Sequence, residues 1–426
     1  MLRRRALVVI AVVLLAACAS DAPDRGTPVA VAPSSLASAS PAPTGTIPAP
    51  TGLPDFYSVP DPLPAGQPGD VIKTESIANT KLHGTLTRVM YHSRSIQDAD
   101  IPVTGLIAIP STPAPADGYP VITWAHGTTG IADKCAPSLS PDDYADVANN
   151  LLDAGYAVVA SDEEGLGTPG RHPYIVGESE ARGTLDIVRA ARNLPDVHAS
   201  DRYLVWGHSQ GGHAAMFALH IADTWAPELH LVGVVAGAPP SQLALFYAIL
   251  QASPYKHYLL MAAAGFNAAY GDEVAPLDAV LTQTGLDALP AVDAGCSTDV
   301  ALATASLATS TVTKADPNSI PAWAKLLKEN DPGQFTTPAP EPLLIIHGGS
   351  DEQIPVVSSQ LLFDQLCKIG QVEQRWVYPG QKHSGVIAPS FGDMLRWIGD
   401  RFAGGPAPDP VAPTGQADVQ AQRCPA

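Results

Sequence analysis

The chain has 426 residues and a formal net charge of −18, from 42 acidic and 24 basic side chains. This excess of negative charge opposes binding to nucleic-acid phosphates and to anionic lipid headgroups, so we expect no nucleic-acid partner. The histidines and cysteines form no C-x-x-C pair and no cluster at metal-ligand spacing, which argues against a structural metal.

The first 18 residues are typical of an export signal. Three arginines at positions 3–5 precede an apolar run over residues 6–17, which is too short for an ordinary membrane span. The run ends in Leu-Ala-Ala before Cys18 and so resembles a bacterial lipoprotein signal, which implies cleavage before Cys18 and a lipid on its sulfur. The protein would then be exported and anchored to the cell membrane by that lipid. The alternative is an ordinary cleaved signal and a freely secreted protein.

Two further segments, residues 19–70 and 404–426, are rich in proline, alanine and small polar residues. Such segments bury too little apolar surface to offset their chain entropy, so we expect a linker and a C-terminal tail. The remaining part, residues 71–403, has roughly 330 residues, more than a single core usually holds. We therefore expect one core with a large insertion, or two domains.

Predicted strands and helices alternate along most of residues 71–403. Strands are expected at 85–91, 103–109, 119–125, 156–160, 203–206, 231–236, 343–346 and 372–378. Helices are expected at 141–154, 180–194, 212–219, 356–369 and 391–402. Short apolar strands that alternate with helices predict an α/β fold, with a mostly parallel sheet flanked by helices on both faces.

The alternation stops at about residues 241–341. Leu243, Phe246, Tyr247 and Leu250 recur there at helical spacing, and further Ala- and Leu-rich pieces are broken by glycine and proline. We expect this segment to form a helical cap inserted into the α/β domain. A cap of this composition would offer an apolar pocket to a ligand.

The motif Gly207-His208-Ser209-Gln210-Gly211 lies between the strand at 203–206 and the helix at 212–219. A sharp strand-to-helix turn of this G-x-S-x-G type lifts the serine hydroxyl clear of the sheet, where a base can remove its proton. The motif alone is weak, because serine and small residues often meet in turns. Its position makes Ser209 the candidate nucleophile.

A serine nucleophile needs a base and an orienting acid, which follow it in this kind of fold with the acid first. Asp351 follows the strand at 343–346, and His383 follows the strand at 372–378. The ordinary alternatives are a loop aspartate bonded to its own backbone and a surface histidine. Asp162 is a rival acid that we rank lower because it precedes the serine. His126, His208 and His347 are expected to shape turns rather than to act as bases.

Acyl transfer also needs hydrogen-bond donors aimed at the developing oxyanion. The backbone N–H of Gln210 is one candidate, because it follows the nucleophile directly. The loop after the strand at 119–125 is the other, with Thr128 as the donor and its hydroxyl as a possible additional one. The alternative for this loop is a simple glycine turn.

The four cysteines after Cys18 are an even number in a chain predicted to be exported, so we expect two disulfides. Three pairings are open. We favour Cys135 with Cys296 and Cys367 with Cys424.

Several motifs together resemble the α/β-hydrolases and, more narrowly, the secretory lipase family of fungi and actinobacteria. The matching residues are Trp124-Ala125-His126-Gly127-Thr128-Thr129-Gly130, Asp133-Lys134-Cys135-Ala136-Pro137-Ser138, Asp162 with Glu164-Gly165-Leu166-Gly167, Gly207-His208-Ser209-Gln210-Gly211-Gly212, His347-Gly348 with Asp351 and Pro355, and His383. The resemblance spans about residues 71–402. It implies an α/β-hydrolase fold with a helical cap, and hydrolysis of acylglycerols or related esters by Ser209, His383 and Asp351 without a cofactor. The lipoprotein-type signal and the proline-rich linker depart from the family pattern.

Other functions remain open on the same residues. A serine peptidase on the same fold would need a site that reads a peptide terminus, and the sequence shows no such cluster. An acyltransferase would use the same first half-reaction as a hydrolase. A surface lipoprotein that binds lipid in the same cleft without turnover is a third alternative, against which the intact order of serine, acid and histidine speaks.

Overall fold

The structure is a computed structural model that describes residues 45–47, 49–78, 81–251, 253–405, 407, 413 and 418–424. The predicted export signal, its Cys18 and the first half of the predicted linker, residues 19–44, lie outside these residues. Among the described residues, no helix combines the length and apolar character that a membrane crossing requires.

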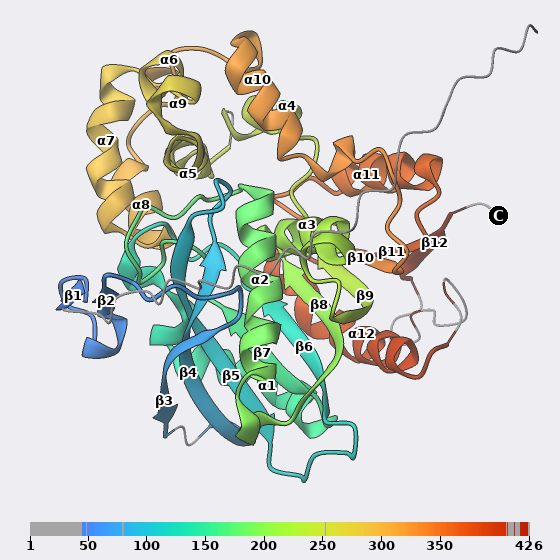
Figure 1. Cartoon of the computed structure of the whole chain (residues 1–426). Coiled ribbons are helices and arrows are strands. Elements are labelled where there is room, and N and C mark those ends of the chain that lie inside the picture. Colours follow the sequence, from blue (N-terminus) through green and yellow to red (C-terminus); the bar gives the residue numbers. More distant parts are fainter. Residues whose placement is uncertain are drawn as a thin grey trace, which may run out of the picture. The chain divides into compact units, whose positions relative to one another are not determined.

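The centre of the fold is a ten-stranded sheet with the order β12-β11-β10-β9-β8-β6-β7-β5-β4-β3 (Figure 1). Its strands are β3 (Val71–Ile77), β4 (Gly84–Arg94), β5 (Asp100–Pro110), β6 (Tyr119–Ala125), β7 (Ala157–Ser161), β8 (Ala199–His208), β9 (His230–Gly237), β10 (Leu343–Gly348), β11 (Glu373–Tyr378) and β12 (Gln420–Arg423). The neighbours from β7 through β11 are parallel, and the outer pairs are antiparallel. The predicted mostly parallel sheet is confirmed, and β3 is an added edge strand that the sequence did not predict.

Helices cover both faces of the sheet, and the central strands are therefore buried on both sides. On β7, Ala157 and Val159 join one core cluster while Val158 and Ala160 join the other, as the two-residue period of a strand requires. The first cluster contains residues of α2 (Gly177–Arg192), α3 (Gln210–Trp225) and α11 (Val356–Ile369). The second contains residues of α1 (Pro141–Asp153) and α12 (Ile387–Phe402).

A group of helices lies between β9 and β10 in the chain, where the sequence predicted a helical cap. They are α4 (Leu243–Gln251), α5 (His257–Val274), α6 (Leu277–Val280), α7 (Gln283–Ala294), α8 (Ser297–Thr304), α9 (Thr309–Val312) and α10 (Pro321–Glu329). They share a core that includes Met261, Phe266 and Trp323, together with Tyr174 and Val176 from the loop after β7. The helices therefore pack over the loop that leaves one of the central strands.

The N-terminal boundary of the folded part differs from the prediction. The predicted linker contains β1 (Gly45–Ile47), a 3₁₀ helix at Asp55–Tyr57 and β2 (Val59–Asp61). The Tyr57 side chain is fully buried and its hydroxyl lies 2.6 Å from the Ser138 hydroxyl. The boundary at residue 70 is therefore wrong, because distant residues supply burial that the local composition does not suggest.

The C-terminal tail also differs from a simple proline-rich extension. Its residues 420–423 form β12, which pairs antiparallel with β11. Cys424 then forms a disulfide with Cys367, and a second disulfide joins Cys135 to Cys296, the two pairings that we favoured. The predicted tail is thus partly an edge strand.

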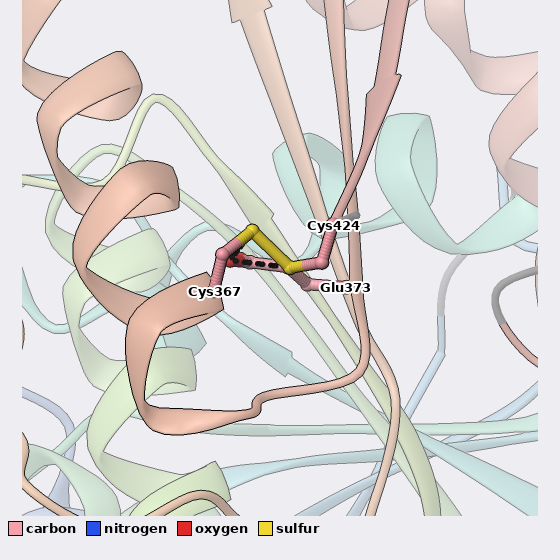
Figure 2. A group of neighbouring side chains, drawn as sticks. All are labelled: Cys367, Glu373 and Cys424. Carbon is pink, nitrogen blue, oxygen red and sulfur yellow. Dashed lines mark hydrogen bonds between the residues drawn. A yellow bond between two sulfur atoms is a disulfide. The ribbon is translucent and has the colours of Figure 1, made fainter. Parts of the chain in front are cut away.

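Glu373 lies beside the disulfide of Cys367 and Cys424 (Figure 2). Burial raises the pKa of the Glu373 carboxyl to about 9, and Asp364 adds to the rise. The ligand atoms of Cys367, Glu373 and Cys424 lie close enough together to hold a metal ion. Because the two sulfurs are bonded to each other, they offer no thiolate ligand.

Candidate active site

Ser209 lies in a strained turn between β8 and α3. Its φ is 60° and its ψ is −123°, in a region that a residue with a side chain rarely adopts. The turn requires glycine on both sides, because a Cβ on Gly207 would meet the carbonyl of Gly211, and one on Gly211 would meet that of Ala125. The Ser209 N–H donates to the Gly237 carbonyl at 2.9 Å, which ties the turn to the end of β9. The predicted strand-turn-helix geometry is therefore present.

The structure brings Asp351 and His383 together. The Nδ1 atom of His383 lies 2.7 Å from Oδ2 of Asp351. The other oxygen, Oδ1, accepts the backbone N–H groups of Gln353 and Ile354 at 2.9 and 2.8 Å. The His347 Nε2 atom, 3.2 Å from Oδ2, completes the set. This arrangement directs Nε2 of His383 away from Asp351 and leaves it free to act as a base.

Asp351 is held in its ionised form. Burial, the largest single effect, raises the pKa of this carboxyl, but the hydrogen bonds from His347 and His383, the charge of His383 and the Ile354 N–H together hold the pKa below its usual range. His347 was predicted to shape a turn, and its Nε2 also lies 2.9 Å from the Ile354 carbonyl. It therefore supports both the loop and the carboxylate.

The residue before Ser209 lies against this pair. The rings of His383 and His208, the residue before Ser209, have centroids 4.6 Å apart. Within the described part of the chain, no hydrogen bond is recorded at Ser209 Oγ. Catalytic hydrogen bonds are often long or poorly aligned before substrate binds, so this does not exclude a serine that pairs with His383 later.

The loop after β6 runs beside the nucleophile turn. A Cβ built on Gly127 would lie 3.4 Å from the His208 carbonyl oxygen and 3.9 Å from Ser209 Cβ. Thr128 lines the same cavity as Ser209, and its hydroxyl lies 2.8 Å from the Tyr174 hydroxyl. Gln210, the other predicted oxyanion residue, is the first residue of α3, so its N–H is one of the unpaired donors at that helix start.

Among the described residues, no histidine is hydrogen-bonded to the carboxylate of Asp162, the rival acid. Its Oδ1 accepts the backbone N–H of Ser138 at 2.7 Å, and its Oδ2 accepts the hydroxyls of Thr104, at 2.7 Å, and Ser138. His126 bonds instead to two carbonyls, those of Gly127 and Asp162. Both residues therefore tie loops together, and Asp351 is the acid that pairs with His383.

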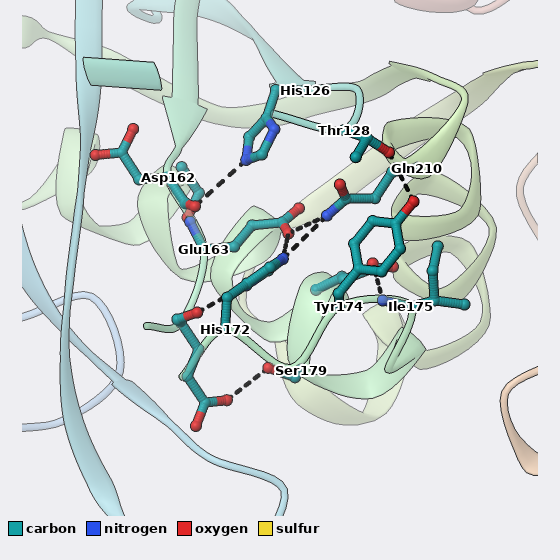
Figure 3. A network of polar contacts seen from close by, with 12 residues as sticks. His126, Thr128, Asp162, Glu163, His172, Tyr174, Ile175, Ser179 and Gln210 are labelled. Atoms are coloured by element: carbon teal, nitrogen blue, oxygen red, sulfur yellow. Dashed lines mark hydrogen bonds and ion pairs between the residues drawn. The ribbon is translucent and has the colours of Figure 1, made fainter. Parts of the chain in front are cut away.

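A buried polar network behind Gln210 was not predicted from the sequence (Figure 3). The Gln210 side chain contacts Glu163 and His172, and each of the three is about 1% exposed. The only sequence signal was a pair of glutamates, Glu163 and Glu164, after Asp162 at the end of the apolar strand β7. Only the three-dimensional structure shows that Glu163 is buried.

An apolar cavity opens at Ser209 and extends into the cap. It encloses about 960 Å³ of empty space, counting the part that is open to solvent. Its walls come from the cap helices and from the loops after β6, β7 and β10, and include Thr128, Tyr174, Leu243, Phe246, Leu250, Ala262, Ala263, Phe266, Trp323 and Ile354. The cavity therefore offers a mostly hydrophobic ligand direct access to the serine.

The sheet order, the strained serine turn and the Asp351–His383 pair define the chain as an α/β-hydrolase. A solved structure of Candida antarctica lipase A superimposes with a TM-score of 0.71 at 22% identity, over 82% of this chain and 85% of that one. The model of the family described as secretory lipase matches residues 143–409. The chain belongs to the secretory lipase family, as the sequence resemblance predicted.

Curated relatives agree with this assignment. A secreted triacylglycerol lipase of Malassezia globosa is 25% identical over 372 residues, 82% of this chain and 80% of the relative. Lipase A of Moesziomyces aphidis is 26% identical over 253 residues, which span 55% of this chain and only 53% of the relative. A Mycobacterium tuberculosis protein named a probable inactive lipase is 24% identical over 83% of each chain.

Proposed function

We propose that the protein is a carboxylic ester hydrolase, and specifically a lipase, that forms an acyl-enzyme on Ser209. The observation that carries the proposal is the bond between His383 and Asp351, at the end of the sheet where the strained Ser209 turn opens into an apolar cavity. Each part serves a different need of acyl transfer: activation, exposure of the nucleophile and binding of the acyl chain.

The reaction follows from these positions. His383 Nε2 takes the proton of Ser209 as Oγ attacks the ester carbonyl, and the ionised Asp351 stabilises the imidazolium. The oxyanion accepts hydrogen bonds from the Gln210 N–H and from the Thr128 loop. Collapse breaks the ester C–O bond, and His383 returns the proton to the leaving alcohol. Water then attacks the acyl-enzyme by the same steps and releases the acid.

The substrate we propose is a triacylglycerol or a related acyl ester. Support comes from the apolar walls of the cavity and from relatives named secreted triacylglycerol lipases. Those names and the predicted export signal also support a site of action outside the cytoplasm. Anchoring by a lipid on Cys18 is a further part of the proposal, and it concerns residues outside the described ones.

The direct test is hydrolysis of p-nitrophenyl esters of increasing acyl length by the wild-type protein and by Ser209→Ala. We expect turnover by the wild type only, and covalent labelling of Ser209 by a fluorophosphonate. Equal rates for the two proteins would contradict the proposal.

A non-catalytic lipid-binding protein is the second candidate, and the relative named a probable inactive lipase favours it. It predicts binding of a fluorescent fatty ester in the cavity without turnover and without labelling of Ser209. The same two assays therefore separate the two candidates.

A further inference from the structure

Glu163 is a buried carboxyl group behind the proposed oxyanion site. It follows β7, is 1% exposed and has a φ of 72°, which is unusual for a residue with a side chain. Its Oε2 accepts a hydrogen bond from Nε2 of Gln210 at 2.8 Å. No lysine or arginine in the described part of the chain forms an ion pair with it. A strained, buried acid in contact with a residue of the site is a reason to seek a function for it.

Among the described residues, the basic side chain that lies against Glu163 is that of His172. His172 Nε2 lies 3.6 Å from Glu163 Oε2 and 3.2 Å from Nε2 of Gln210, a donor, so this ring nitrogen accepts. Its Nδ1 lies 2.8 Å from the Glu164 carbonyl and therefore carries the proton. Burial lowers the pKa of His172 to about 4, so the ring supplies no positive charge at neutral pH.

The other charged groups around Glu163 are mainly acidic. Glu180 on α2 lies on one side, where its carboxylate is 2.6 Å from Nδ1 of His213 on α3. Asp162 precedes Glu163, and His126 contacts the Asp162 carbonyl from the β6 loop. Burial, and then the negative charge of Glu180, raise the pKa of Glu163 well above its usual value. Both effects disfavour a second negative charge here.

Two buried oxygens without hydrogen-bond partners support a proton on the Glu163 carboxyl. Oε1 of Glu163 and Oε1 of Gln210 both lack a hydrogen-bond partner among the described residues. With Glu163 ionised, both atoms are acceptors, and each leaves a buried polar group unsatisfied. With Glu163 protonated on Oε1, that atom can donate to Gln210 Oε1 while Oε2 accepts from Nε2, so the acid and the amide satisfy each other.

We propose that Glu163 is a neutral carboxylic acid and a positioning residue that clamps the Gln210 side chain and so fixes the Gln210 backbone N–H at the oxyanion site. This inference rests on the proposed function only for its effect on rate. It assigns the buried network a purpose, because the donor must be in place before negative charge develops on the substrate.

The test compares Glu163→Gln with Glu163→Ala. Glutamine reproduces the donor and acceptor of the protonated acid, so we expect the kcat of Glu163→Gln to lie within about threefold of wild type. Because glutamine cannot ionise, the variant should keep this kcat to a pH at least as high as wild type does. Alanine should lower kcat by about 10- to 100-fold with little change in KM, as for loss of an interaction made in the transition state. Glu164→Gln is the matched control, since its carboxylate accepts from Ser179 instead. Equal losses for Glu163→Gln and Glu163→Ala would overturn the proposal.

Infrared difference spectroscopy of wild type against Glu163→Gln gives a readout independent of turnover. We expect a carboxylic-acid C=O band in the wild type at neutral pH that the variant lacks, and its absence would also overturn the proposal. This measurement decides the case even if Glu163→Ala does not fold. If the Ser209→Ala comparison fails while the band is present, the proposed function is wrong and the protonation of Glu163 stands.

Discussion

The Asp351 carboxylate and the His383 ring are 2.7 Å apart, and both side chains are almost completely shielded from solvent, at 0% and 4% exposure. A buried carboxylate is stable only when its oxygens are satisfied, and here two backbone N–H groups and two histidines do so. This pair sets the orientation of the proposed base, and the first prediction follows from it.

Asp351→Asn should lower kcat by about 10⁴-fold, because an amide in this position holds His383 in the wrong tautomer. KM should change much less. The measurement is steady-state hydrolysis of a p-nitrophenyl ester by purified protein. Glu352→Gln is the control, since the Glu352 carboxylate accepts the His383 backbone N–H rather than a ring N–H, and its loss should cost little. Similar losses for the two variants would show that Asp351 has no special role.

Thr128→Val tests the side-chain contribution to the oxyanion site. It removes the hydroxyl that lies 2.8 Å from the Tyr174 hydroxyl while keeping the shape of the residue. We expect kcat to fall by about 10- to 100-fold with KM nearly unchanged. Thr129→Val is the matched control, because the Thr129 hydroxyl is buried without a partner in the described structure and does not line the Ser209 cavity. A full rate for Thr128→Val would leave only backbone donors at this site.

Ala262→Phe should shorten the acyl chains that the protein accepts. Ala262 lies on α5 and lines the cavity, so a phenyl ring there fills space that a long chain needs. The ratio of long-chain to short-chain kcat/KM should fall by about tenfold or more. Ala268→Phe lies on the exposed side of the same helix and should leave the ratio unchanged. An unchanged ratio in Ala262→Phe would place the acyl chain elsewhere.

The disulfide between Cys135 and Cys296 should matter for turnover, whereas the other should not. It joins the segment after the Thr128 loop to the start of α8, where the Ser297 N–H also donates to the Thr129 carbonyl at 2.7 Å. Replacing either cysteine pair by alanine should cost about 2–5 kcal/mol of stability. Only the Cys135/Cys296 variant should also lose kcat. Thermal melts measure the stability and ester assays the kcat of both variants, and equal kcat values would refute a role of the Cys135–Cys296 disulfide in turnover.

His208 should make the fold less stable in acid. Burial, and then the neighbouring His383, lower its pKa from 6.5 to about 3 in the folded state. Below about pH 6.5 the His208 side chain is protonated in the unfolded chain but stays neutral in the folded chain. The free energy of unfolding therefore decreases as the pH is lowered, by up to about 1.4 kcal/mol per pH unit. His208→Asn removes this dependence. Urea unfolding from pH 7 to pH 4 should therefore show the variant gaining stability relative to wild type; a constant difference would mean that His208 titrates normally.

Much of the fold could be predicted because the signals were local. The central strands are continuous apolar runs, and the helices between them carry regular apolar stripes, so the α/β class followed from residues such as Val158 and Leu185. The resemblance to secretory lipases was also confirmed. The edge strand β12 and the buried Tyr57 were missed, because their partners, Trp376 and Ser138, lie far away in the chain.

The sequence by itself determined the order of the candidate residues: a serine in a glycine-flanked turn, then an acid and a histidine after later strands. These features depend on residue type and neighbours, which the chain displays directly. Only the tertiary structure decided that Asp351 rather than Asp162 meets His383, and that Glu163 lies buried against Gln210. Both facts depend on which loops the parallel sheet brings to one end. Neighbouring residues in the sequence do not indicate burial, or hydrogen bonds to partners 30 or more residues away.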